Sequence, residues 1–362
     1  MSSTASETGM GSRSLLDRLD SDGVICAEGY LFELERRGYL QAGAFVPEVV
    51  LEHPEALTQL YREFVHAGSD VIEAFTYYGH RDKLRLIGKE SLLEPLNREA
   101  MRLAHGAADE AASLSAGERP LVAGNTCNTN VYHPGDKASV TAARSMFEEQ
   151  VAWAAEEQAD FVIGETFTFC GEAQIALEVI RESGLPAVMT LAVPATGALL
   201  DGYSPAEAAA MLEDGGADVV GINCYRGPAT IIPVLRQVRD AVSCPVAALP
   251  VPYRTTEQHP TFFGLPDREE GAVPGGRPFP TALEPLLCNR YELARFAQEA
   301  SALGVRYLGI CCGNAPHYTR AIAEAIGRTP PASRYSPDMS KHFAFGTDPN
   351  LDARNAEFAS RL

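Results

Sequence analysis

Short runs of apolar residues alternate along the chain with longer stretches in which apolar residues recur at helical spacing. Several short runs are apolar at consecutive positions, as expected of strands that are covered on both faces. The predicted strands are Val24–Cys26, Val71–Phe75, Leu121–Gly124, Phe161–Ile163, Ala187–Val193, Val219–Ile222, Pro245–Pro252 and Tyr307–Ile310. The predicted helices are Glu55–Ala67, Ser91–Ser115, Ser139–Glu157, Gly171–Ser183, Ser204–Asp214, Thr230–Val242 and Tyr291–Leu303.

The ends of these segments agree with the assignment. Ser204-Pro205 places a capping hydroxyl before a proline at the first helical position, and Gly304 follows a predicted helix. About eight strand–helix units follow one another, the number that closes a (β/α)₈ TIM barrel. An open doubly wound sheet is the alternative, but it normally has a Gly-rich phosphate turn after its first strand, and Cys26–Tyr30 is not one. The pattern favours an α/β barrel in a single domain.

The composition of the chain suggests three segments. Residues 1–14 are rich in Ser, Thr and Gly and lack the apolar region of a secretory signal, so we expect a disordered tail. Residues 15–330 form the predicted barrel, and residues 331–362 are Pro-rich and polar, as in a C-terminal extension. Within the barrel, Tyr253–Leu283 is Pro/Gly-rich without periodicity. A loop of that length is usually functional, often as a lid.

Charge excludes some classes of partner. The chain has 48 acidic and 30 basic residues and a net charge of −18, so its average field repels nucleic acid and anionic membranes. No apolar run approaches the roughly 20 residues that span a bilayer. We therefore expect a cytoplasmic protein that acts on small molecules.

Three of the eight cysteines stand at predicted strand ends. In a reducing compartment, cysteines are buried apolar residues, ligands or nucleophiles more often than disulfides. The sixth strand ends at Cys224 and the eighth ends at Cys311-Cys312. Active sites of TIM barrels lie at the carboxyl ends of the strands, so these thiols would converge there.

Three protein thiolates with one open position are typical of a catalytic zinc site. Zinc deprotonates a coordinated thiol, so a substrate thiol in the open position would become the attacking thiolate. A metal-free barrel with packed cysteines is the alternative, because Cys311-Cys312 is not a Cys-x-x-Cys motif.

The strand-end motifs match a known family. Gly221-Ile222-Asn223-Cys224 and Gly309-Ile310-Cys311-Cys312-Gly313 resemble the homocysteine S-methyltransferases. Leu34-Glu35-Arg36-Arg37-Gly38-Tyr39, His53-Pro54-Glu55-Ala56 and Phe75-Thr76-Tyr77-Tyr78 are similar to the betaine–homocysteine branch. The likeness covers roughly residues 15 to 330.

This resemblance implies a reaction and a cofactor. A methyl group would pass from an onium donor, betaine-like or sulfonium, to the zinc-bound thiolate of homocysteine, giving methionine. Zn²⁺ would be held by Cys224, Cys311 and Cys312. By position, Glu165 matches the carboxylate that holds the amino group of homocysteine, in keeping with the need to pair a desolvated ammonium.

The donor side is expected to be aromatic, because an onium group without N–H donors is recognised by aromatic faces. The resemblance places Phe45, Tyr77 and Tyr78 at the donor site, and Tyr253 begins a loop that could close over them. The family is commonly oligomeric, so we expect a homo-oligomer.

The sequence departs from the family at the first strand. The family has an Asp-Gly-Gly or similar turn where this chain has Ala27-Glu28-Gly29, so Glu28 and Gly29 become the candidate acceptor-site residues. A shift by one residue points a strand side chain to the other face unless a bulge intervenes. Phe45 also stands where a Trp is expected. The alternatives are S-methylmethionine or S-adenosylmethionine as donor, another thiol as acceptor, and a non-catalytic zinc- or thiol-binding protein.

Overall fold

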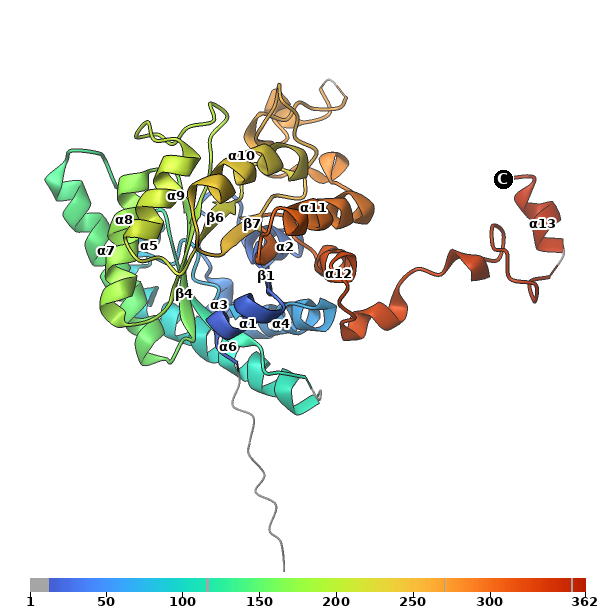
Figure 1. Ribbon diagram of the computed structural model, residues 1–362, viewed down its shortest axis with the longest axis horizontal. Coiled ribbons are helices and arrows are strands. Elements are labelled where there is room, and N and C mark those ends of the chain that lie inside the picture. Colours follow the sequence, from blue (N-terminus) through green and yellow to red (C-terminus); the bar gives the residue numbers. More distant parts are fainter. Residues whose placement is uncertain (1–12, 115–116, 270, 353) are drawn as a thin grey trace, which may run out of the picture.

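The computed structural model describes residues 13–114, 117–269, 271–352 and 354–362. Its centre is a closed barrel in which each strand pairs in parallel with the next and β8 pairs with β1 (Figure 1). The strands are β1 (Val24–Ala27), β2 (Val71–Glu73), β3 (Leu121–Cys127), β4 (Phe161–Phe167), β5 (Ala187–Leu191), β6 (Val219–Asn223), β7 (Val246–Leu249) and β8 (Tyr307–Ile310). The predicted TIM barrel is confirmed.

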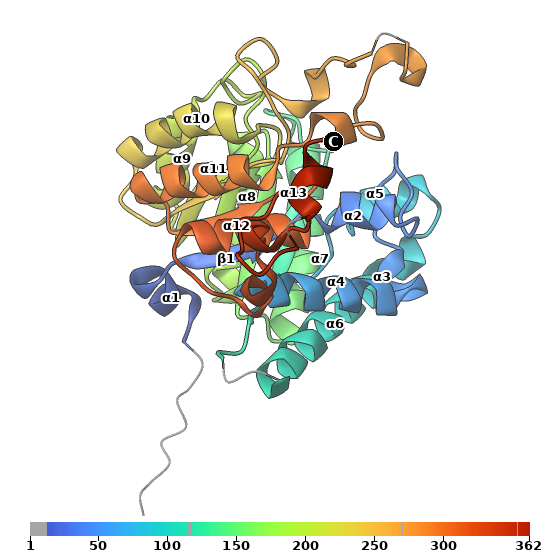
Figure 2. The same cartoon turned by 90° about the vertical axis from the view of Figure 1, so that its right-hand side faces the viewer.

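Helices surround the barrel and bury their apolar faces against it (Figures 1 and 2). The α-helices are α1 (Leu15–Ser21), α2 (Tyr30–Arg36), α3 (Val49–Glu52), α4 (Pro54–Ala67), α5 (Arg81–Leu86), α6 (Leu93–Leu114), α7 (Lys137–Glu156), α8 (Cys170–Ser183), α9 (Pro205–Asp214), α10 (Pro228–Ala241), α11 (Arg290–Ala302), α12 (Pro316–Ala325) and α13 (Arg354–Ala359). Short 3₁₀ helices are η1 (Glu90–Leu92), η2 (Phe262–Gly264), η3 (Pro274–Gly276), η4 (Glu284–Leu286), η5 (Pro331–Tyr335) and η6 (Met339–Lys341).

The structure differs from the predicted elements mainly at the mouth of the barrel. β3 and β4 continue to Cys127 and Phe167, beyond the predicted ends, and all seven positions of each strand are buried. The prediction stopped early because these strands end in polar residues, which are buried here because they face one another across the mouth. Helix α12 was not predicted, and its N-cap, Ala315, offers no capping side chain as a start signal.

An aspartate stands just before β2, β4 and β6 and joins each of these strands to the one before it. The carboxylates of Asp70, Asp160 and Asp218 accept hydrogen bonds from backbone N–H groups at 2.7, 2.7 and 2.8 Å. The donors are Ile25 in β1, Val122 in β3 and Ala187 in β5. These three hydrogen bonds link β1 to β2, β3 to β4 and β5 to β6 at the N-terminal ends of the strands.

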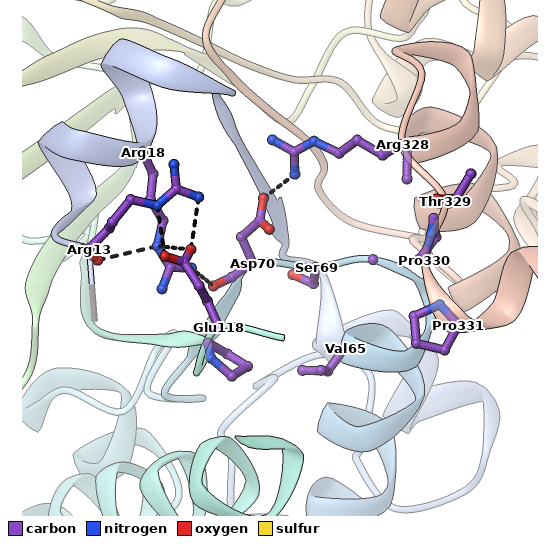
Figure 3. A pocket seen from close by; sticks show the side chains of 13 residues that line it. Arg13, Arg18, Val65, Ser69, Asp70, Glu118, Arg328, Thr329, Pro330 and Pro331 are labelled. Atoms are coloured by element: carbon purple, nitrogen blue, oxygen red, sulfur yellow. Dashed lines mark hydrogen bonds and ion pairs between the residues drawn. The ribbon is translucent and has the colours of Figure 1, made fainter. Parts of the chain in front are cut away.

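The same end of the barrel holds a network of ion pairs around a hollow of about 390 Å³ (Figure 3). Arg328, which follows α12, pairs with Asp70, and Arg13 donates two hydrogen bonds to Glu118. Arg18 lies 3.5 Å from Glu118 and is 4% exposed. Arg328 is thus joined to the residue before β2, and Arg13 and Arg18 to the segment before β3. This is the face where TIM barrels carry stability and not catalysis.

The chain leaves the barrel after η5, which contacts α4. Beyond it the C-terminal segment extends away from the barrel, with α13 at its far end (Figures 1 and 2). The boundaries proposed for tail, barrel and extension stay predictions, and residues 1–12 of the predicted tail lie outside the described residues. In the described part of the chain, none of the helices has the length and apolar character needed to cross a bilayer.

Candidate active site

Three cysteine thiols meet at the carboxyl ends of β6 and β8, as the sequence predicts. The sulfur atoms of Cys224, Cys311 and Cys312 lie within 4.8 Å of one another, and those of Cys311 and Cys312 are 4.0 Å apart. Two sulfur ligands of a tetrahedral zinc ion, each at about 2.3 Å, are about 3.8 Å apart. The triad therefore fits zinc with little rearrangement, and it leaves the fourth ligand position for another group.

Unusual backbone conformations bring these thiols together. Cys224 and Tyr225 have φ values of 54° and 51°, consecutive left-handed conformations in residues other than glycine. Each costs about 1 kcal/mol or more. Gly29 has φ 82°, and a Cβ atom there would lie 2.2 Å from the carbonyl oxygen of Cys311. Gly29 therefore contributes to the site through its backbone, because no side chain fits between it and β8.

The three thiols influence one another's ionisation. Burial opposes ionisation of Cys224, but contacts with Cys311 and Cys312 keep its pKa well below the ordinary value. The same contacts with Cys224 raise the pKa of Cys311 and of Cys312 well above that value. A coordinated divalent cation favours the thiolate form of each of its sulfur ligands.

A cluster of buried carboxyl groups lies next to the triad. Glu28, Glu73 and Glu165 are 1%, 3% and 3% exposed. Oxygens of Glu28 and Glu165 lie within 4.8 Å of each other and of the Cys311 sulfur. Neither oxygen of Glu28 has a hydrogen-bond partner among the described residues. Glu28 reaches the site despite the shift by one position, because β1 ends at Ala27 and the left-handed Gly29 redirects the chain.

Glu165 accepts hydrogen bonds from two side-chain amides, whereas Glu28 has none of that length, although the nearby Asn223 amide favours its ionised form. The side-chain amides of Asn125 and Asn223 each donate to Glu165 at 2.8 Å, one to each carboxylate oxygen. Burial raises the pKa of Glu165 to about 7, and burial raises the pKa of Glu28 and Glu73 well above the ordinary value. A buried acid cluster of this kind needs either protons or a cationic ligand such as an ammonium group.

Sequence reasoning missed several residues of this cluster. Glu73 interrupts the otherwise apolar run Val71–Phe75, and that interruption was an available signal. Asn125, which donates to both Glu73 and Glu165, stands past the predicted end of the third strand. Asn223 belongs to the motif around Cys224, but the motif does not indicate that its side chain holds Glu165.

The predicted donor-site aromatics fall into two groups. Tyr77 lines a small cavity together with Cys311, Cys312, Glu165 and other residues of the mouth. Its ring centroid lies 4.4 Å from that of Tyr78. Tyr77 therefore lies at the cavity of the triad, and Tyr78 is its neighbour.

Phe45 and Tyr253 belong to a second group, which we call the lid cluster. Its members are Phe32, Phe45, Tyr225, Tyr253, Phe262, Phe263 and Phe279. Phe262, Phe263 and Phe279 come from the 253–283 loop, and their rings contact Phe32 and Tyr225 outside it. The function of this loop as a lid stays a prediction. Tyr225, which the sequence did not single out, directly follows Cys224 and lies 4.7 Å from Phe263.

Comparison with known proteins gives a consistent result. The family described as homocysteine S-methyltransferase matches residues 25–326. Betaine–homocysteine S-methyltransferase 1 of Xenopus tropicalis is 36% identical over 340 residues, covering 92% of this chain and 80% of the relative. The S-methylmethionine–homocysteine S-methyltransferase of Mus musculus is 34% identical over 349 residues, covering 94% and 88%.

A solved structure shows the same fold. The metallated form of the homocysteine methyltransferase MmuM from Escherichia coli has a TM-score of 0.66 and 20% identity, and the match covers 84% of this chain and 96% of that one. The family match spans the whole barrel and includes all three cysteines of the triad. The chain belongs to the homocysteine S-methyltransferase family and is an enzyme of that class.

Proposed function

We propose that this chain transfers a methyl group from betaine or S-methylmethionine to the thiol of homocysteine, giving methionine. The observation that carries the proposal is the position of an unpaired, buried Glu28 carboxyl group next to three thiols that fit zinc. One side of the mouth suits an amino-acid thiol, and the aromatic residues opposite suit an onium group. The names of the relatives at 36% and 34% identity support the two donors.

The acceptor is held at both of its functional groups. Cys224, Cys311 and Cys312 would hold a zinc ion, whose positive charge would make the acceptor thiol ionise at neutral pH. Glu28 and Glu165 face the same space and bind the acceptor's ammonium group, which replaces the protons that these buried carboxyl groups otherwise need. Fixing both ends of a short amino acid directs its sulfur toward the donor.

The onium donor lies against the aromatic side of the mouth. Tyr77 provides an electron-rich face, and Tyr78 packs against it at a ring-centroid distance of 4.4 Å. The acceptor sulfur attacks the donor's methyl carbon, a new C–S bond forms, and the C–N or C–S bond of the donor breaks. The donor leaves as a tertiary amine or a thioether and keeps the electron pair of that bond. No general base is needed for the transfer, so the protein contributes orientation and exclusion of water.

Homo-oligomer formation through the C-terminal segment is part of the proposal. This segment carries large apolar side chains that are more than half exposed, namely Tyr335, Met339, Phe343 and Phe345 at 67%, 57%, 55% and 61%. Exposed apolar residues gathered on an extended segment are typical of a surface that binds another protein. We assign that partner as a second copy of this chain.

A reducing compartment such as the cytoplasm suits this chemistry. All eight cysteines are free thiols, and the triad can bind zinc only while it stays reduced. The compartment is a proposal that rests on this requirement.

The zinc-loaded protein is expected to form methionine from homocysteine with at least one of glycine betaine, dimethylsulfoniopropionate, S-methylmethionine and S-adenosylmethionine. Cys311→Ala should lose both zinc and activity, because two thiols cannot complete the site. Cys170→Ala, which removes a buried thiol outside the triad, is the matched control and should keep both. Zinc measured by atomic emission at one ion per chain in Cys311→Ala would refute the ligand assignment.

Glu28→Gln should raise the KM for homocysteine about tenfold to a hundredfold, the cost of a lost charge-assisted hydrogen bond. Its zinc content and its KM for the methyl donor should stay unchanged. Glu55→Gln is the matched control, because it removes a carboxylate charge from a side chain that is 70% exposed and lies outside the site. An unaltered KM for homocysteine in Glu28→Gln would show that Glu28 does not hold the acceptor.

Sedimentation equilibrium should give a mass at least twice that of the 38.9 kDa chain. The double variant Phe343→Ser/Phe345→Ser should shift this mass toward the monomer, because it removes apolar area from the extended segment. Leu86→Ser changes a side chain that is 64% exposed on the barrel and serves as the control. A monomeric wild-type protein would contradict the proposed assembly.

A further inference from the structure

The ammonium group of Lys83 lies over the ring of Tyr78, 3.9 Å from its centroid. Lys83 belongs to α5, which begins just after the loop that carries Tyr77 and Tyr78. The structure gives it neither a hydrogen bond nor a carboxylate within 4.0 Å among the described residues, and it is partly buried. Tyr78 thus already carries a cation on one face, in a region expected to bind a cationic donor.

Burial lowers the pKa of Lys83, and the nearby Asp82 and Cys127 only partly oppose this effect. Asp82, the adjacent acid, is bonded to Arg85. The ring of His80 meets Tyr78 edge-on, and burial lowers its pKa to about 4, so it is neutral. Burial raises the pKa of the Cys127 thiol, which accepts a hydrogen bond from the Tyr78 backbone N–H at 3.3 Å, so this thiol is neutral too. A partly buried ammonium in such surroundings favours an anionic ligand.

Other cations near the mouth are already bonded within the protein. Arg36 donates to the Tyr253 hydroxyl at 2.9 Å and to Glu284 at 3.0 Å. Arg226 donates to the backbone carbonyls of Val193 and Pro194. Their guanidinium groups hold the lid cluster and a neighbouring loop in place, whereas the Lys83 ammonium has its donors available.

Lys83 is also within reach of the methyl-transfer centre. The ammonium lies 3.9 Å from the Tyr78 centroid, which lies 4.4 Å from that of Tyr77, so the ammonium is within about 8 Å of the Tyr77 ring. Tyr77 lines the cavity that contains Cys311 and Cys312. A donor molecule that spans this distance needs its onium group near the triad and an anionic group at its other end.

We propose that Lys83 binds the carboxylate of the methyl donor and so restricts the enzyme to zwitterionic donors, in which one or a few carbon atoms separate an onium centre from a carboxylate. This inference rests on the proposed function and names the class of donor more narrowly. Tyr78 then has a positioning role: its ring holds the Lys83 ammonium, while the onium group contacts other aromatic faces.

Glycine betaine and betaine amide, in which an uncharged carboxamide replaces the carboxylate, test whether Lys83 binds the carboxylate of the donor. The dissociation constants of both for the zinc-loaded protein are measured by calorimetry, alongside KM values for the donor and for homocysteine. Wild type is expected to prefer betaine over the amide. Lys83→Met should lower that preference about tenfold to a hundredfold and raise the donor KM, with kcat, zinc content and the homocysteine KM little changed. Lys83→Arg should restore most of the preference.

Lys89→Met is the matched control, because this lysine is paired with Glu48 away from Tyr78 and its loss should change neither ligand's affinity. An unchanged preference in Lys83→Met, or a rise in the homocysteine KM instead of the donor KM, would overturn the assignment. Absence of turnover with every donor would refute the proposed function, and the binding measurements would still decide the role of Lys83. Equal affinity of the wild-type protein for betaine and betaine amide would also overturn the assignment of Lys83.

Discussion

The structure at the mouth of the barrel depends on bringing three sulfur atoms from two strands to one point. The chain meets this constraint at some cost in backbone energy. Cys224 and Tyr225 take left-handed conformations that disfavour residues with side chains, and Gly29 packs directly against the Cys311 carbonyl. Gly309 in β8 allows a similar approach, since a Cβ there would lie 2.1 Å from the carbonyl oxygen of Cys26. Strain concentrated at one point on a rigid barrel is typical of a functional site.

Two kinds of group that can bind a cation surround this point. Buried carboxyl groups from the ends of β1, β2 and β4 and aromatic residues that follow β2 and β6 both lie near the triad, and one cavity is lined by Tyr77 together with Glu73 and Glu165. Each kind of group suits a different cation: a carboxylate pairs with an ammonium that has N–H donors, and an aromatic face accepts an onium that has none. The ammonium group of the acceptor and the onium group of the donor can thus bind near the triad at different side chains.

The barrel and the cysteine triad could be predicted because their signals are local. Continuous apolar runs identify buried parallel strands, and the strand-end positions of Cys224, Cys311 and Cys312 place them at the same end of the barrel. The carboxyl cluster could not be completed in this way, because Glu73, Asn125 and Glu165 meet only across three different strands. The position of Glu28 was also undetermined, because alternation of side chains along a strand gives no rule beyond the last paired residue.

Three protein thiols leave one zinc-ligand position for the thiol of the acceptor. Zinc K-edge X-ray absorption of the zinc-loaded protein, before and after addition of homocysteine, counts the sulfur ligands directly. We expect three sulfur ligands and one lighter ligand without homocysteine, and four sulfur ligands with it. If the zinc ion keeps three sulfur ligands in the presence of saturating homocysteine, the acceptor thiol does not bind at the open position.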